Sequence, residues 1–102
     1  MIARIWQGVT STRMAGRYLE YLHRRVIPAY QEATGSAGLI VLREPRGELV
    51  HFLLLSFWRS EDSLASFVGA DLEVMKPTTE EKSFLIAFES TARNYKVVCK
   101  VK

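Results

Sequence analysis

The chain has 102 residues, of which 48% are hydrophobic and 25% are charged, and its formal net charge is +3. This length and apolar content predict one folded domain over residues 1–102 and exclude a disordered chain. The basic residues are scattered, with Arg24–Arg25 as the only adjacent pair. They lack the clustered basic patch of a nucleic-acid-binding protein, so we expect no nucleic-acid partner.

Cysteine and hydropathy patterns limit the location and the cofactors. A single cysteine, Cys99, excludes an internal disulfide and agrees with a reducing, cytoplasmic location. No segment approaches the ~20 apolar residues of a membrane span, and the first residues lack a signal-peptide pattern, so we expect no membrane partner. The two histidines are far apart in the sequence, and no carboxylates stand at the spacing of metal ligands. We therefore expect no metal site and no cofactor.

The first half of the chain predicts a strand, a helix and a hairpin. Residues 2–9 are rich in Ile, Val and Trp and predict a strand, after which Thr10 or Ser11 caps a helix. Apolar residues at three- and four-residue spacing continue this helix to residue 33, with a kink or break at Pro28 and a stop at Gly35. Residues 37–43 and 48–58 predict two strands joined by a turn over residues 44–47.

The second half predicts two helices and a closing strand. Ser60 caps the first helix, whose apolar stripe is Leu64, Phe67 and Val68 and which ends at Gly69. Residues 78–81 have the form of a capping box on a short helix, and residues 94–101 form the last strand. The order predicts a ferredoxin-like βαββαβ fold of the α+β class, with a four-stranded antiparallel sheet and helices on one face.

The third strand lacks the alternation expected of a sheet with one solvated face. Val50, Phe52 and Leu54 point to one side, while Leu53, Leu55 and Phe57 point to the other, so both faces require burial. Because the helices cover only one face, an uncovered second face would be strongly adhesive. The sequence therefore predicts a homodimer that packs sheet face against sheet face.

Three stretches, IARIWQGVT, HFLLLSFWRSEDSLASFVG and NYKVV, resemble the antibiotic biosynthesis monooxygenase family. The strand-to-helix junction with Trp-x-Ser-x-x-x-Leu/Phe is the most specific part of the resemblance, which spans nearly the whole chain. It implies a dimeric α/β barrel. It also implies either a cofactor-independent monooxygenase of polyketide or quinol substrates or a haem-degrading enzyme.

The chain departs from both patterns that the resemblance implies. Of the polar set Asn, Trp, Tyr and Arg in the polyketide-oxidising relatives, Trp58 alone matches, and Leu54 and Leu64 lie nearby. Haem-degrading relatives supply an axial His after the second helix and an Asn from the first strand. Residues 71–80 contain no His and residues 5–7 contain no Asn, which argues against haem.

Several residues are candidates for a site. Trp58 either plugs the core or stacks a flat substrate. His51 points to the opposite side of the strand from Trp58. It is either a proton acceptor or a hydrogen-bonded histidine of the dimer interface. One of Asn94 and Tyr95 must point inward, and an inward Asn94 would bind a substrate oxygen. Tyr18 and Phe67 are aromatic residues of the core face that would contact a ring.

Two functions remain open from the sequence. In the first, Trp58, Tyr18, Phe67 and Tyr95 bind a small aromatic or quinol-type substrate, and His51 or Asn94 handles its proton or oxygen. In the second, the chain is a non-catalytic homodimeric module that binds a small ligand or serves as a structural partner.

Overall fold

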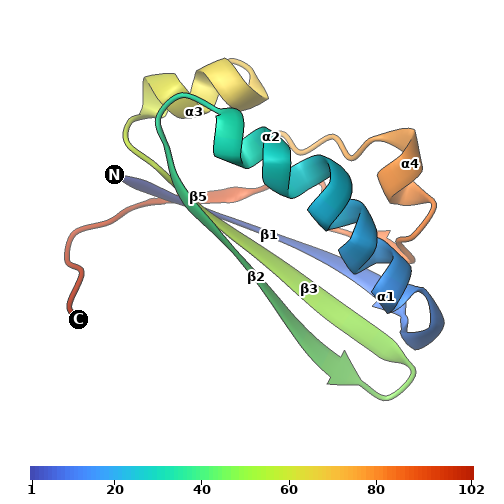
Figure 1. The fold of residues 1–102 in the computed structure, drawn as a ribbon. Helices are drawn as coiled ribbons and strands as arrows, with labels where there is room; N and C mark the ends of the chain where they lie inside the picture. Colours follow the sequence, from blue (N-terminus) through green and yellow to red (C-terminus); the bar gives the residue numbers. More distant parts are fainter.

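The computed structural model describes residues 1–102 and contains one five-stranded antiparallel sheet (Figure 1). Its strands have the order β2-β3-β1-β4, and β5 also pairs with β1. The sheet is therefore ferredoxin-like in its connections, as predicted, but it has five strands instead of four. The strands are β1 (Ile2–Ser11), β2 (Ser36–Arg46), β3 (Leu49–Trp58), β4 (Ala87–Phe88) and β5 (Arg93–Lys96).

The helices all lie on one side of the sheet, as Figure 1 shows. A long helical arm, made of α1, η1 and α2 over residues 12–32, lies across the strands. Two shorter helices, α3 and α4, follow β3. No helix is long and apolar enough to cross a membrane. The helical elements are α1 (Thr12–Tyr21), the π-helical turn η1 (Leu22–Val26), α2 (Ile27–Glu32), α3 (Glu61–Val68) and α4 (Thr79–Lys82).

The helical arm passes Pro28 without a break, because a π-helical turn precedes it. The backbone N–H of Ile27 bonds the carbonyl oxygen of Leu22, five residues earlier, and Pro28 then stands in the first turn of α2. A proline is tolerated there because its missing N–H has no partner within the helix in any case. The predicted kink is thus a local widening of the arm directly above the sheet.

Capping explains the remaining helix starts. Ser11 caps α1, accepting a hydrogen bond from the Met14 N–H, and Ser60 forms a reciprocal capping box with Ser63 on α3. On α4, the Thr78 hydroxyl accepts from the Glu81 N–H as predicted. The Glu81 side chain, in contrast, does not return to Thr78 but enters the core.

Two strand boundaries differ from the prediction. The hairpin turn is the two-residue Gly47–Glu48, and Arg46 and Leu49 still pair. Gly47 has a φ of +61°, which a glycine adopts without strain. A short strand that was not predicted, β4, precedes β5, and residues 90–92 between the two hydrogen-bond to residues 73–75. The predicted strand over residues 94–101 ends at Lys96.

The two faces of the sheet differ in burial. Trp6, Phe52, Leu54 and Trp58 point toward the helices and are buried. On the outer face, Ile40 and Leu42 are 46% and 47% exposed, and no element of the chain covers them. The apolar character of both faces, predicted from the strand pattern, is confirmed.

Candidate functional site

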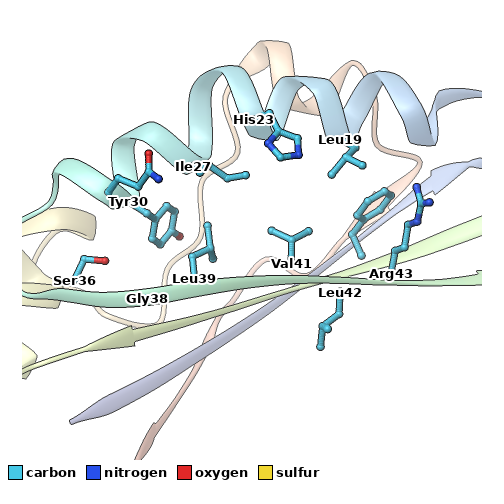
Figure 2. A pocket seen from close by; sticks show the side chains of 12 residues that line it. Leu19, His23, Ile27, Tyr30, Ser36, Gly38, Leu39, Val41, Leu42 and Arg43 are labelled. Atoms are coloured by element: carbon cyan, nitrogen blue, oxygen red, sulfur yellow. The ribbon is translucent and has the colours of Figure 1, made fainter.

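A cleft of about 670 Å³ lies between the helical arm and the edge strand β2 (Figure 2). It opens there because β2 is the last strand of the sheet, so nothing continues the floor beyond it. This volume lies within the range of small-molecule sites in proteins. The cleft is larger than the cavity of about 390 Å³ at the end of α3.

Apolar side chains build the walls of this cleft. Leu39 and Val41 point up from β2. The buried Phe52 of β3 also lines the cleft. Leu19 and Ile27 descend from the arm above. Leu42 also borders the cavity but points to the opposite face of the sheet (Figure 2). The interior therefore suits a flat, apolar molecule.

Polar groups are confined to the rim of the cleft. His23 hangs from the η1 turn between the arm and β2, and Arg43 rises from the far end of β2 (Figure 2). Gln31 and Ser36 occupy the opposite end of the cleft. His23 is exposed to solvent, and it is the only imidazole in the lining. A ligand bound in the cleft would meet hydrogen-bonding groups at its edges and apolar atoms on its faces.

An aromatic cluster closes the α2 end of the cleft. The ring of Tyr30, which lines the cleft, lies 5.8 Å from Trp58 and 4.8 Å from Phe67 between centroids. Burial raises the pKa of Tyr30, and the charge of Arg4 together with a hydrogen bond from Ser56 offsets part of this effect. The phenol is therefore held neutral and directed toward the sheet.

Trp58 lies behind this wall and does not reach the cleft. It is fully buried, and its indole Nε1–H donates to the Ser56 hydroxyl at 3.0 Å. Of the two interpretations open from the sequence, its placement is that of a core residue that supports Tyr30. Phe67 packs on the same indole at 4.9 Å and is half-buried.

Tyr18 binds a buried carboxyl group. Its hydroxyl donates to Oε2 of Glu81 at 2.8 Å, and its ring packs edge-on against Phe52 at 4.9 Å. Burial raises the pKa of Glu81, and the hydrogen bond from Tyr18 offsets part of this effect; burial and the nearby carboxyl also raise the pKa of Tyr18. Neither residue lines the cleft, so the pair joins α4 to α1 and does not contact a ligand there.

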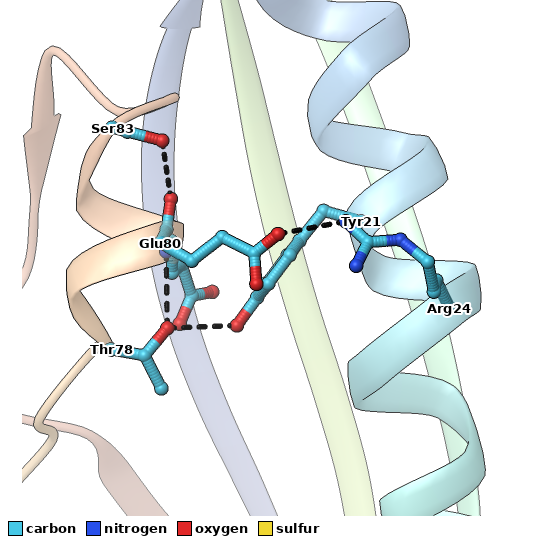
Figure 3. A network of polar contacts seen from close by, with 6 residues as sticks. Tyr21, Arg24, Thr78, Glu80 and Ser83 are labelled. Atoms are coloured by element: carbon cyan, nitrogen blue, oxygen red, sulfur yellow. Dashed lines mark hydrogen bonds and ion pairs between the residues drawn. The ribbon is translucent and has the colours of Figure 1, made fainter.

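A second set of contacts holds α4 from the outside (Figure 3). The Tyr21 and Thr78 hydroxyls lie 2.9 Å apart, and an Arg24 guanidinium nitrogen approaches Oε2 of Glu80 at 2.8 Å. The Arg24–Glu80 ion pair is solvent-exposed, so it contributes little to stability. Together with Tyr18–Glu81, these contacts fix α4 against the helical arm.

The predicted site residues do not converge on one cavity. His51 and Tyr95 lie on the outer face of the sheet, the latter 51% exposed, whereas Trp58 and Asn94 lie on the helix side. Asn94 is the inward residue of its pair. Its amide donates to the Leu72 carbonyl at 2.9 Å and accepts from Arg4 at 3.2 Å.

Sequence reasoning missed three buried polar groups. Arg4 is 3% exposed, Glu81 is buried at the start of α4, and Trp6 donates its indole N–H to the Glu89 carbonyl at 2.6 Å. The burial of Arg4 could have been predicted from the alternation of side chains along β1. Residues 2, 4 and 6 share a face, so the Arg4 side chain lies on the same side of the strand as two core residues. Burial also lowers the pKa of Arg4 from its ordinary value.

The cleft contains two side chains of a kind that can ligate a haem iron. A haem iron requires an axial side chain such as His, Cys, Met or Tyr. The two in the cleft are His23 at the rim and Tyr30 at the α2 end. His51 lies on the opposite face of the sheet, and no group of His, Cys, Asp and Glu residues forms a metal site.

Comparison with solved structures shows which fold this is. A protein of the antibiotic biosynthesis monooxygenase type from Deinococcus radiodurans aligns with 100% of this chain and 97% of its own, at 14% identity and a TM-score of 0.71. This chain has the fold of the antibiotic biosynthesis monooxygenases. No protein-family model and no curated protein sequence matches the chain.

Two further structures of this fold differ in activity. SnoaB, a cofactor-independent oxygenase from Streptomyces nogalater, aligns with 98% of this chain and 96% of its own at 11% identity and a TM-score of 0.65. MhuD, a haem-degrader from Mycobacterium tuberculosis, aligns over 100% of both chains at 18% identity and a TM-score of 0.63. At these identities the likeness is one of fold, and the chemistry has to be argued from the side chains.

Proposed function

We propose that this chain is a cofactor-independent monooxygenase that oxidises a flat aromatic or quinol-type molecule bound in the cleft between the arm and β2. The observation that supports it is the cleft itself, which has apolar walls and a rim with one imidazole and one guanidinium. The fold it shares with SnoaB, a cofactor-independent oxygenase, supports the same class of reaction.

In this proposal the substrate supplies the electrons for the reaction with dioxygen. In an anthrone, the activated ring CH₂ group becomes a carbonyl, and in a hydroquinone a ring C–H becomes C–OH while the two phenols become the quinone carbonyls. In both reactions one oxygen atom of O₂ enters the product and the other leaves as water, so no external reductant is required. The protein needs to bind the ring, accept a proton and exclude water. His23 is the candidate proton acceptor, because imidazole suits general base catalysis near neutral pH. Arg43 stabilises the resulting oxyanion.

The sequence candidates take supporting roles in this proposal. Trp58 and Phe67 position Tyr30, which forms the end wall of the cleft. Tyr18 holds Phe52 in the floor by its edge-on contact. His51 and Tyr95 belong to the outer face, where we place the contact between two copies of the chain.

Oxygen uptake with a panel of anthrones and hydroquinones, without added metal or reductant, tests the proposal. We expect one O₂ consumed per substrate molecule and a loss of about 10²-fold or more in kcat for His23→Gln. The matched control is His51→Gln, which changes the other histidine on the opposite face of the sheet and is expected to leave kcat unchanged.

One observation favours a second function, a non-catalytic module that binds a small ligand. His23 and Arg43 are the only charged or imidazole side chains of the lining, and no carboxylate joins them. Binding of a panel compound without oxygen uptake, abolished by Leu39→Trp but not by the exposed Arg46→Trp, would establish the module and contradict the enzyme.

The outer face leads us to infer a homodimer. Ile40, Leu42 and Tyr95 are exposed there beside the half-buried Leu55 and Phe57. An apolar surface of this kind marks an interaction site on a protein, and a second copy supplies the same apolar surface in return.

A further inference from the structure

Arg4 is a buried cation with no anionic partner. Its guanidinium donates to the carbonyl oxygens of Leu72 and Val74 and to Oδ1 of Asn94, all of which are neutral acceptors. The two ion pairs of the chain, Arg24–Glu80 and Arg46–Glu44, do not involve it. Because buried charges in proteins are ordinarily paired, a guanidinium held by neutral groups alone is available to an anion.

One donor of Arg4 is free inside the protein. A guanidinium has five N–H donors, and the four on its two terminal nitrogens are directed at protein acceptors, including the Met75 sulfur at 4.0 Å. Nε makes no hydrogen bond within the chain, yet no side-chain nitrogen or oxygen sealed from solvent is without a partner. Nε is therefore not sealed from solvent, and Arg4 lines an adjacent cavity of about 390 Å³.

This cavity combines positive charge with apolar walls. Phe67 and Val68 from the end of α3 form one side, and Val74 and Met75 form the other. Lys76 adds a second cation at the edge.

A single acidic residue borders the same cavity. Asp71 is exposed, and its Oδ1 accepts a hydrogen bond from the Glu73 N–H at 3.1 Å. The carboxylate is thus engaged with the turn after α3, and the lining keeps an excess of one positive charge.

We propose that this second cavity binds a small organic monocarboxylate, whose carboxylate accepts from Nε–H of Arg4 and whose apolar body lies against Phe67, Val68 and Val74. A hydrogen bond from a charged guanidinium to a carboxylate is roughly twice as strong as one between neutral groups. The cavity shares no lining residue with the cleft of the proposed oxidation, although Phe67 contacts Tyr30 in the end wall of the cleft.

Binding of 4-ethylbenzoate, followed through the backbone amide signals of the ¹⁵N-labelled chain, tests this site. We expect shifts confined to residues 67–76 and to Arg4. The uncharged isostere 4-ethylbenzamide is expected to bind about 10- to 100-fold more weakly, because it offers no charge to the guanidinium. This comparison uses the unaltered chain, so it does not depend on a variant that folds.

Arg4→Met, which keeps most of the side-chain length, is expected to remove the preference for the carboxylate. Arg93→Met, on the exposed surface of the neighbouring strand, is its matched control and is expected to keep it. Equal affinity for benzoate and benzamide, or shifts that instead cluster at residues 19–43 around the cleft, would overturn the proposal. Either result leaves the oxygen-uptake test of the cleft unaffected.

Discussion

The Tyr18–Glu81 pair makes stability depend on pH. Burial raises the pKa of Glu81, so the folded chain binds a proton at pH values where the unfolded chain has released it. Between the unfolded pKa and the higher folded pKa, the folded state holds more protons, and the free energy of unfolding falls as pH rises. Its contribution is fully present below the unfolded pKa of Glu, about 4.3, and declines through this window.

Glu81→Gln removes this dependence, because an amide does not titrate. We expect the unfolding free energy of the variant, from urea denaturation between pH 4 and pH 8, to fall less steeply with rising pH. The difference amounts to about 1.4 kcal/mol for each unit by which the pKa is raised. Glu80→Gln, the exposed neighbour on α4, is expected to keep the wild-type slope. A Glu81→Gln slope identical to that of the wild type would show that Glu81 ionises in the folded state as it does in the unfolded state.

Substitution by alanine should have opposite effects on stability at two glycines, Gly35 and Gly16. Gly35, in the turn between α2 and β2, has a φ of +82°, and a Cβ there would lie 2.3 Å from Cβ of Ser63 in α3. Gly16 lies on the exposed side of α1, where an added Cβ meets no atom within 4 Å. The first glycine thus permits the arm and α3 to approach each other, whereas the second only loosens a helix.

We expect Gly35→Ala to lower the free energy of unfolding by about 2 kcal/mol or more, through both strain and collision. Gly16→Ala is expected to raise it by roughly 0.5–1 kcal/mol, because alanine is the better helix former. Urea denaturation of the two variants beside the wild type measures both effects. Stabilisation by Gly35→Ala would mean that the turn and α3 do not meet as described.

Local patterns predicted the elements well because their causes are local. Ser11, Ser60 and Thr78 cap the helices that follow them, as the sequence indicates. The additional strand β4 was missed, since its separation from β5 depends on hydrogen bonds from residues 90–92 to residues 73–75. Such pairing is set by where the chain returns and not by the composition of the strand.

The same reasoning accounts for what was missed in the site. Arg4 is covered by residues about 70 positions later, and Tyr18 meets Glu81 across 63 positions. A capping box explained Glu81 from its neighbours alone, and so its burial was not foreseen. The strand pattern left open which face of the sheet Trp58 occupies. It lies on the helix side, but Tyr30 stands between its indole and the cleft.

The uncovered face of the sheet is the surface through which we propose that two copies of the chain associate. Leu55 lies near the middle of this face, paired with Ile5 on one side and Ile40 on the other. A lysine at this position would place a charge among apolar side chains if a second copy covered them, at a cost of several kcal/mol to the assembly. In a lone chain the same lysine would extend into water with little effect.

We therefore expect the wild-type chain at micromolar concentration to sediment with about twice its mass of 11.6 kDa, and Leu55→Lys to sediment as a single chain. Gln31→Lys adds the same charge on the exposed side of α2 and is expected to remain dimeric. The variants should differ in mass while their far-ultraviolet circular dichroism stays that of the wild type. A wild-type mass of one chain under these conditions would refute the dimer, and the apolar outer face would then require a different partner.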